Sequence, residues 1–255
     1  MSFIRQCTAT IEAVYKNDAD LFFNEWKQLR TSGSICQSGS CPFVPESSFD
    51  YDPEHFLYYR TRAITADIPN SNGDYFPLPE IEASYPTFIG KGVFLNHAND
   101  DPEKAFGLIL DSVLHKDAKY VELLCALDKE VAEEKHPGIL HKVNTGQINA
   151  TSMSCLCDRA ECGVCHHLAT NAFELCAHMN PKENSYVKGR RAGHGGELAY
   201  EINYGLTFTE DSLVFLPADH TARILQIYSS LNKDASIEEI KSKLAEIQNL
   251  IEGLK

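Results

Sequence analysis

The spacing of hydrophobic residues divides the chain into an N-terminal helix, a central β-rich region and a C-terminal helix. Over the first 30 residues, apolar side chains recur at roughly three- and four-residue intervals, which predicts an amphipathic helix. Its apolar positions are Ile11, Val14, Tyr15, Leu21, Phe22, Trp26 and Leu29. A stretch rich in Ser, Gly and Pro follows and predicts a linker, so we assign residues 1–50 to an N-terminal helix and linker.

The central region alternates short β-rich segments with turn signals and contains no regular strand–helix repeat. This texture argues against a parallel doubly wound sheet. The predicted strands lie within residues 56–66, 86–96, 105–115, 119–127, 200–208 and 211–218. A helical pattern over 130–146 is interrupted at Pro137 and stops at Gly146. We assign residues 51–232 to the main domain.

The last segment, residues 233–255, predicts an amphipathic helix. Ser236 and Glu239 have the spacing of a capping box. Apolar residues then follow the a/d rhythm of a coiled coil, at Ile237, Ile240, Leu244, Ile247, Ile251 and Leu254. The segment is too short for a stable coiled coil on its own. Two interpretations stay open: packing on its own domain, or association with a partner helix or a second copy of the chain.

Charge and composition narrow the functional classes. The 255 residues carry a net charge of −13, which argues against a general nucleic-acid binder because such proteins need a basic face. No apolar run is long enough to cross a membrane, and the N-terminus lacks the apolar core of a secretory signal. We therefore expect a chain without nucleic-acid or membrane partners, in a cytoplasm-like compartment.

Five of the nine cysteines fall between Cys155 and Cys176, which in a reducing compartment indicates metal binding rather than disulfides. A Cys-x2-Cys pair and a later Cys-x-His pair supply four ligands of the kinds that zinc prefers. They are Cys162, Cys165, Cys176 and His178. Spare donors nearby leave the fourth position open, at Cys155, Cys157, His166 or His167. The sequence predicts a structural zinc loop over residues 155–180, with reduced thiols in a packed loop as the alternative.

Two further segments contain candidate catalytic groups. His97 ends an apolar, strand-like run, and Ser152 and Ser154 follow a glycine turn and a short strand-like stretch. Peptide hydrolysis needs an activated hydroxyl or thiol, a base within hydrogen-bonding reach and a third group that orients the base. Taken singly, none of these residues indicates such a site.

The order of these residues along the chain, in contrast, does indicate such a site. Five motifs occur between residues 57 and 228: NSNGDYFP at 70–77, FLNH with His97, AFGLILDS with Gly107, TSMSC with Ser152, and EDSLVFLPADHTA at 210–222. This series resembles the prohead (head maturation) serine proteases of tailed phages, whose fold is similar to that of herpesvirus assemblins. In one respect the chain departs from the pattern, because Ser154 stands where the family has glycine.

The resemblance implies an α+β fold: a mainly antiparallel β-barrel flanked by helices, with the zinc loop as an insertion after the nucleophile strand. It implies Ser152 as the nucleophile and His97 as the general base. Glu210 is the candidate third member, with Asp100, Asp101 and Asp111 as rivals. Ser154 remains a competing nucleophile.

The implied function is a serine endopeptidase that cleaves scaffold and capsid proteins inside a viral procapsid assembled in the host cytoplasm. Self-association through the C-terminal helix would fit that role. Two alternatives remain: a non-catalytic, zinc-stabilised scaffold or structural head protein, and a cysteine protease that uses Cys155 with His97.

Overall fold

The fold was analysed in a computed structural model of the chain, which describes residues 14–15, 19–32, 52–179, 189, 191–192 and 197–228. The predicted linker after residue 32 and the predicted C-terminal helix over 233–255 lie outside these residues. No helix within the described residues is long and apolar enough to span a membrane.

Strands dominate the described residues. The strands are β1 (Val14–Tyr15), β2 (Phe56–Thr65), β3 (Asp74–Tyr75), β4 (Gly92–Leu95), β5 (Gly107–His115), β6 (Tyr120–Asp128), β7 (Ala150–Leu156), β8 (Arg159–Cys162), β9 (Leu168–Ala169), β10 (Arg191–Ala192), β11 (Glu197–Leu198), β12 (Glu201–Tyr204), β13 (Thr207–Val214) and β14 (Arg223–Tyr228). The α-helices are α1 (Ala19–Ser32), α2 (Leu78–Ser84), α3 (Lys129–Lys135) and α4 (Ile139–Asn144), and the 3-10 helices are η1 (Tyr85–Phe88) and η2 (Pro102–Lys104).

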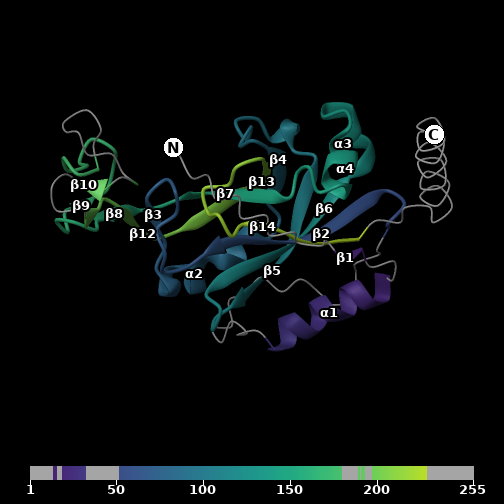
Figure 1. Cartoon of the computed structure of the whole chain (residues 1–255), viewed down its shortest axis with the longest axis horizontal. Coiled ribbons are helices and arrows are strands. Elements are labelled where there is room, and N and C mark those ends of the chain that lie inside the picture. Colours follow the sequence, from purple (N-terminus) through teal and green to yellow (C-terminus); the bar gives the residue numbers. More distant parts are fainter. Residues whose placement is uncertain are drawn as a thin grey trace, which may run out of the picture.

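Seven strands close into a barrel in the order β14-β2-β6-β5-β4-β13-β7, and β7 returns to β14 (Figure 1). Direction cannot alternate all the way around a closed ring with an odd number of strands, so at least one neighbouring pair must be parallel. That pair is β4–β13, and every other pair in the ring is antiparallel. The predicted α+β, mainly antiparallel barrel is thereby confirmed.

Buried aliphatic and aromatic side chains fill the barrel. Successive side chains of a strand point to opposite faces, so alternate residues of β2, β5 and β6 point inward. The apolar side chains among them supply the interior of the barrel. Phe88 from η1 stacks on Phe208 from β13, with ring centroids 3.9 Å apart. This contact packs η1 against β13, the strand that also carries Glu210.

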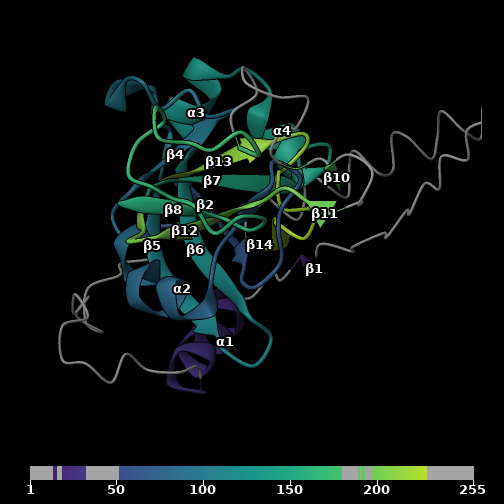
Figure 2. The ribbon, with the colours of Figure 1, turned by 90° about the vertical axis from the view of Figure 1, so that its left-hand side faces the viewer.

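Helix α1 covers the outer face of β2, β5 and β6, on the side of the barrel opposite α3 (Figures 1 and 2). Phe22, Phe23 and Trp26 pack against Tyr58 and neighbouring barrel residues. The Trp26 indole nitrogen also donates a hydrogen bond of 3.0 Å to the buried Asp111 carboxylate. The N-terminal helix is therefore packed against the barrel.

A second sheet, which we call the outer sheet, stands at one end of the long axis and has the order β3-β12-β8-β9 (Figure 1). Strand β7 leaves the barrel at Leu156 and turns directly into β8. One strand of the outer sheet, β8, thus follows directly from a barrel strand.

Three sequence predictions require correction. The strands predicted over 200–208 and 211–218 are β12 and β13, and the break between them falls after Tyr204, where Gly205 has a left-handed φ of 65°. Val14 and Tyr15 form a short parallel pair with β14 instead of helix, and α1 begins at Ala19. Both residues favour strands, and Asn17 and Asp18 are residue types that begin helices. The predicted strand over 86–96 begins only at Gly92, because the proline-containing segment before it is η1. The predicted interruption at Pro137 is confirmed by the break between α3 and α4.

Candidate active site and metal centre

His97 is placed by the end of β4 and by an unusual turn. Asn96 and His97 both have left-handed backbone conformations, with φ of 51° and 59°. Such φ values are uncommon outside glycine, although Asn and His tolerate them better than most residues. Because β4 lies beside β13, this turn brings the His97 ring onto β13.

Glu210, on β13, bonds to this ring. Its Oε1 lies 2.8 Å from His97 Nδ1, and the carboxylate is fully buried while the His97 side chain is 40% exposed. The hydrogen bond from the ring to Glu210 raises the pKa of His97 above its usual value. Partial burial of the ring opposes this rise, and the charge of Glu210 adds to it. The Nδ1 edge of the imidazole is thus held by a carboxylate, whereas the rest of the ring is partly exposed to solvent.

Ser212 connects the two residues from the same strand. Its hydroxyl donates to Glu210 Oε2 at 2.5 Å and accepts from the backbone N–H of His97 at 3.2 Å. Both oxygens of the Glu210 carboxylate are therefore engaged, which fixes its orientation beneath the ring.

Asp211, which lies between Glu210 and Ser212, faces the opposite side of the strand and is fully buried. Burial, together with the charge of Glu210, raises the pKa of Asp211 well above its usual value. Burial therefore disfavours the charged form of Asp211, whereas Glu210 is the carboxylate that contacts the His97 ring.

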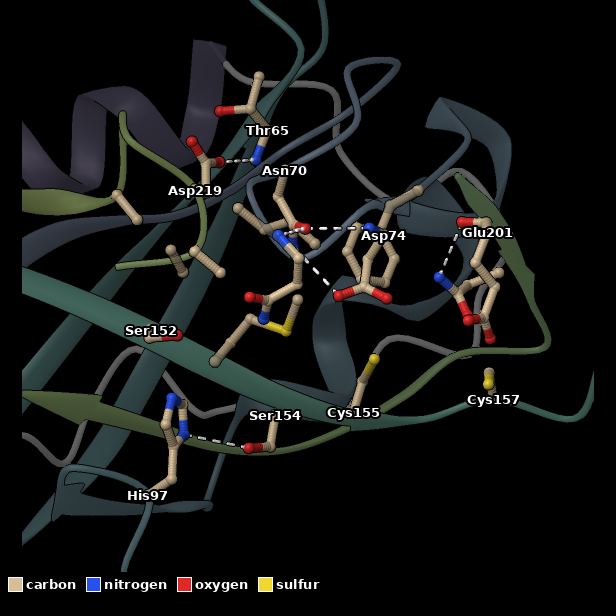
Figure 3. Close-up of a pocket in the computed structure, with 18 residues that line it drawn as sticks. Thr65, Asn70, Asp74, His97, Ser152, Ser154, Cys155, Cys157, Glu201 and Asp219 are labelled. Atoms are coloured by element: carbon tan, nitrogen blue, oxygen red, sulfur yellow. Dashed lines mark hydrogen bonds between the residues drawn. The ribbon is translucent and has the colours of Figure 1, made fainter. Parts of the chain in front are cut away.

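Ser152 and Ser154 lie on β7, which is antiparallel to β13, and they point to the same face of the sheet as Glu210. Ser152 pairs with Ser212 and Ser154 pairs with Glu210. The Ser154 hydroxyl donates to Glu210 Oε1 at 2.5 Å and lies 3.2 Å from His97 Nδ1 (Figure 3). Within the described residues, the Ser152 hydroxyl makes no hydrogen bond, and its residue is 8% exposed.

The bonding of Nδ1 determines which nitrogen of the ring can act as a base. A neutral imidazole has one N–H and one lone pair, and the hydrogen bond to Glu210 places the N–H on Nδ1. The lone pair is then on Nε2, which Figure 3 shows on the side of the ring that faces Ser152. Ser154 contacts only the Nδ1 side, where no lone pair is available to take its proton.

The rival residues are occupied elsewhere. Asp100 pairs with Lys104, Asp101 accepts from a backbone N–H of η2, and Asp111 accepts from Trp26. Cys155 also reaches the cleft described below, but alternation along β7 turns its side chain away from His97 and Glu210, and it packs against the barrel core.

His97, Ser152 and Ser154 lie at one end of a cleft of about 370 Å³. Ser152, Ser154, Cys155 and Cys157 follow one another along its floor (Figure 3). Its remaining lining consists of Ala63, Ile64, Thr65, Asn70, Asn72, Asp74, Phe76, His97, Met153, Glu201, Asn203, Ala218, Asp219 and Ala222. The motif segments 70–77 and 210–222 therefore both reach the same cleft.

One edge of β7 faces this cleft. Along its other edge β7 pairs with β13 over its whole length, whereas it pairs with β14 only at Ala150. From Thr151 onward, no strand of the described residues covers the cleft-side edge. An uncovered strand edge offers alternate N–H and C=O groups to an extended peptide.

The predicted metal ligands come together beside the outer sheet, where Cys162 ends β8 and the other three lie in loops. One donor atom from each of Cys162, Cys165, Cys176 and His178 lies within 4.8 Å of the other three, so the four can hold a metal ion. A tetrahedral zinc site with sulfur ligands places them about 3.8 Å apart. The sulfurs of Cys165 and Cys176 are 3.5 Å apart, and Cys176 Sγ lies 3.8 Å from His178 Nδ1.

The turn at 162–165 carries two of the four predicted ligands, Cys162 and Cys165. The backbone N–H of Val164 points at Cys162 Sγ at 3.4 Å. Partial burial opposes thiolate formation at Cys165, but hydrogen bonds from His167 and neighbouring side chains lower its pKa to about 7. Thiolates are the forms that bind metal.

Two of the spare donors have other partners. His166 Nδ1 lies 2.8 Å from Glu161, and His167 Nε2 lies 2.7 Å from the Glu174 carbonyl oxygen. The sequence left the fourth ligand open, and this arrangement favours His178. The sequence also gave no role to Ser212, although its place in the EDSLV motif next to Glu210 was a usable signal.

No protein-family model matches this sequence, and no curated protein matches it. Among solved structures, the chain is similar to the capsid assembly protease gp21 of bacteriophage T4. The two are 17% identical with a TM-score of 0.38, and the match covers 63% of this chain and 82% of gp21.

Proposed function

We propose that this protein is a serine endopeptidase that cleaves scaffold and capsid proteins during maturation of a viral procapsid. The observation that carries the proposal is the buried Glu210 carboxylate bonded to His97 Nδ1, with the second ring nitrogen directed toward Ser152 on the neighbouring strand. The viral setting rests on the ordered motifs, and places the protein inside the assembling shell.

In the proposed reaction, the Ser152 hydroxyl attacks the scissile carbonyl while Nε2 of His97 takes its proton. Glu210 holds the Nδ1 proton and stabilises the imidazolium that forms. The imidazolium then gives the proton to the leaving amine, which departs and leaves an ester on Ser152. Water, deprotonated by the same nitrogen, hydrolyses the ester and restores the hydroxyl.

The Ser152 hydroxyl lacks a hydrogen bond to His97, which is compatible with this role. Catalytic hydrogen bonds are often long in free enzymes and tighten when substrate binds. A peptide that pairs as a strand with the uncovered edge of β7 would pass directly over Ser152 and supply that change.

The metal ion in this proposal is zinc, and its role is structural. Three thiolates and one imidazole form a closed donor set without an open position for water, as in structural zinc sites. Zinc would tie together a loop whose own apolar core is small.

The decisive experiment compares the wild-type chain with Ser152→Ala, each mixed with candidate scaffold and capsid proteins and assayed by mass spectrometry. We expect cleavage by the wild type and none by the variant, with the fold unchanged by circular dichroism. Ser154→Ala is the matched control on the same face of the strand. Unchanged cleavage by Ser152→Ala would refute the proposal.

A second candidate function is a non-catalytic, zinc-stabilised head protein. The missing hydrogen bond at Ser152 and the serine at position 154 favour it. A fluorophosphonate probe separates the two functions, since only a base-activated serine reacts with it rapidly. Labelling of Ser152 that disappears in His97→Ala would exclude the non-catalytic function.

A further inference from the structure

The outer sheet forms one wall of the substrate cleft, opposite the barrel. Asp74 of β3 and Glu201 and Asn203 of β12 line the cleft across from Ser152 and Ser154 (Figure 3). These residues approach the cleft from the same sheet whose strand β8 ends at the metal ligand Cys162.

Backbone pairing connects the ligands to this wall in a single row. Cys162, a metal ligand on β8, pairs with Glu201, and Glu201 pairs with Asp74. The N–H of Glu201 also donates to the Gly73 carbonyl oxygen at 2.7 Å, and the N–H of Gly163 donates to the Tyr200 carbonyl oxygen at 2.9 Å. The position of Cys162 therefore sets the position of two cleft residues.

Side-chain packing reinforces the connection. A Cβ atom built on Gly163, which lies between the first two ligands, would come within 2.4 Å of the Tyr200 ring. That ring in turn lies 5.6 Å from the ring of Tyr75 on β3, centroid to centroid. Contacts thus run from the metal-binding turn through two aromatic rings to the wall.

The outer sheet has only a small apolar core of its own. Its strands are two to four residues long, and the buried apolar side chains around it are Ala160, Cys162, Ala169, Met179 and Ala199, of which one is a metal ligand. Sheets this small are rarely stable without a hydrophobic face or another constraint. In such domains, metal-binding free energy supplies folding free energy.

We propose that metal binding shapes this wall of the cleft, so that metal occupancy governs how tightly a peptide substrate binds and not how fast the bound peptide is cleaved. The inference rests on the proposed protease function. The catalytic residues lie on barrel elements with their own core, whereas the wall depends on the metal-binding turn.

Two measurements on the full chain test this, each with metal-loaded and chelator-treated protein. Hydrogen exchange is expected to show lost protection at 72–75 and 200–204 as well as in the loop at 159–179. Re-adding Zn²⁺ should restore it. With a peptide whose cleavage requires Ser152, we expect KM to rise about tenfold, as for one or two lost hydrogen bonds, and kcat to change little.

A small fluorophosphonate that reaches Ser152 without contacting the wall should label both forms at equal rates. If labelling and kcat fall together with metal removal, the metal supports the catalytic strand and the inference is wrong. It is also wrong if lost protection stops at β8 and KM is unchanged.

Two variants separate the wall from metal binding itself. Gly163→Ala keeps all four ligands but displaces Tyr200, so it should retain bound metal and still raise KM. His166→Asn is the control in the same turn, because its left-handed φ of 59° suits asparagine and it is outside the ligand set. It should leave metal content and KM unchanged.

Failure of the protease proposal would look different. If the metal-loaded chain cleaves nothing in a Ser152-dependent way and Ser152 is not labelled, the proposed function is wrong, and the claim about substrate affinity falls with it. If Ser152-dependent cleavage is present but KM does not respond to metal or to Gly163→Ala, only the inference about the wall is refuted.

Discussion

The Glu210 carboxylate is fully buried, and its Oε1 lies 2.8 Å from Nδ1 of His97, whose side chain is 40% exposed. This asymmetry directs the chemistry of the ring. The buried partner fixes one nitrogen as a donor and leaves the other as the basic nitrogen toward the cleft. The proposed roles of Ser154, Glu210 and Ser212 depend on that arrangement.

Ser154 is predicted to be dispensable for the chemical step. Its hydroxyl contacts Glu210 and the Nδ1 side of His97, so its loss leaves the basic nitrogen and Ser152 in place. We expect Ser154→Ala to change kcat less than about tenfold, the value of a single hydrogen bond, in steady-state assays. A collapse of kcat comparable to that of Ser152→Ala would instead identify Ser154 as the nucleophile.

Activity is predicted to fall on the acid side at a pH above 6.5. General-base catalysis needs neutral His97, and the hydrogen bond to Glu210 raises the pKa of His97 above 6.5. As the pH falls through this raised pKa, the ring is protonated and kcat/KM declines. Rate measurements between about pH 5 and 9 would locate the transition, which spans the usual titration range of histidine.

Glu210→Gln should shift this transition to lower pH and slow the reaction. The amide has no charge to stabilise the imidazolium, while partial burial of the ring, which lowers the pKa of His97, remains. We expect kcat to fall by about 10³–10⁴, as for comparable triads. NMR titration of His97 should give a lower pKa in this variant, and an unchanged pKa would contradict the assigned partnership.

Ser212 is predicted to be a positioning residue. Its removal leaves the buried Oε2 of Glu210 without its donor and the His97 backbone N–H without its acceptor. Ser212→Ala should lower the free energy of unfolding by about 1–3 kcal/mol in urea titrations, the cost of an unsatisfied buried group. It should also move the His97 pKa measured by NMR. Threonine at this position keeps the hydroxyl, so a failure of Ser212→Thr to restore the His97 pKa would argue against the positioning role.

The uncovered edge of β7 predicts a periodic dependence on substrate backbone groups. A peptide paired there as a strand presents every second N–H to the protein. N-methylation at successive positions of a cleaved peptide should therefore raise KM at alternate positions only. A uniform effect of N-methylation along the peptide would contradict strand pairing.

The sequence was most informative where local pattern decides the outcome. The β-rich segments between turn signals predicted β2, β5 and β6, and Pro137 predicted the break between α3 and α4. The ordered motifs indicated His97, Ser152 and Glu210, which the structure brings to one face of two neighbouring strands. Their catalytic roles remain predictions.

Long-range pairing was beyond the sequence patterns. Val14 and Tyr15 fit a helical spacing, yet they pair with β14 more than 200 residues away. Likewise, nothing local to Cys162 indicates that it pairs with Glu201 and so joins the metal ligands to the cleft. Such partners follow from the closure of the barrel and the path of β7, which depend on the whole chain.

The one parallel pair within the barrel ring, β4–β13, also has a consequence for biosynthesis. It brings together His97 and Glu210, which are 113 positions apart, so a ribosome must finish nearly all of the barrel before His97 meets its carboxylate. An unfinished polypeptide that ends before β13 contains His97 and both serines but lacks the Glu210 carboxylate that contacts His97 and Ser154. In the proposed protease, the catalytic site is therefore assembled only after β13 has been synthesised.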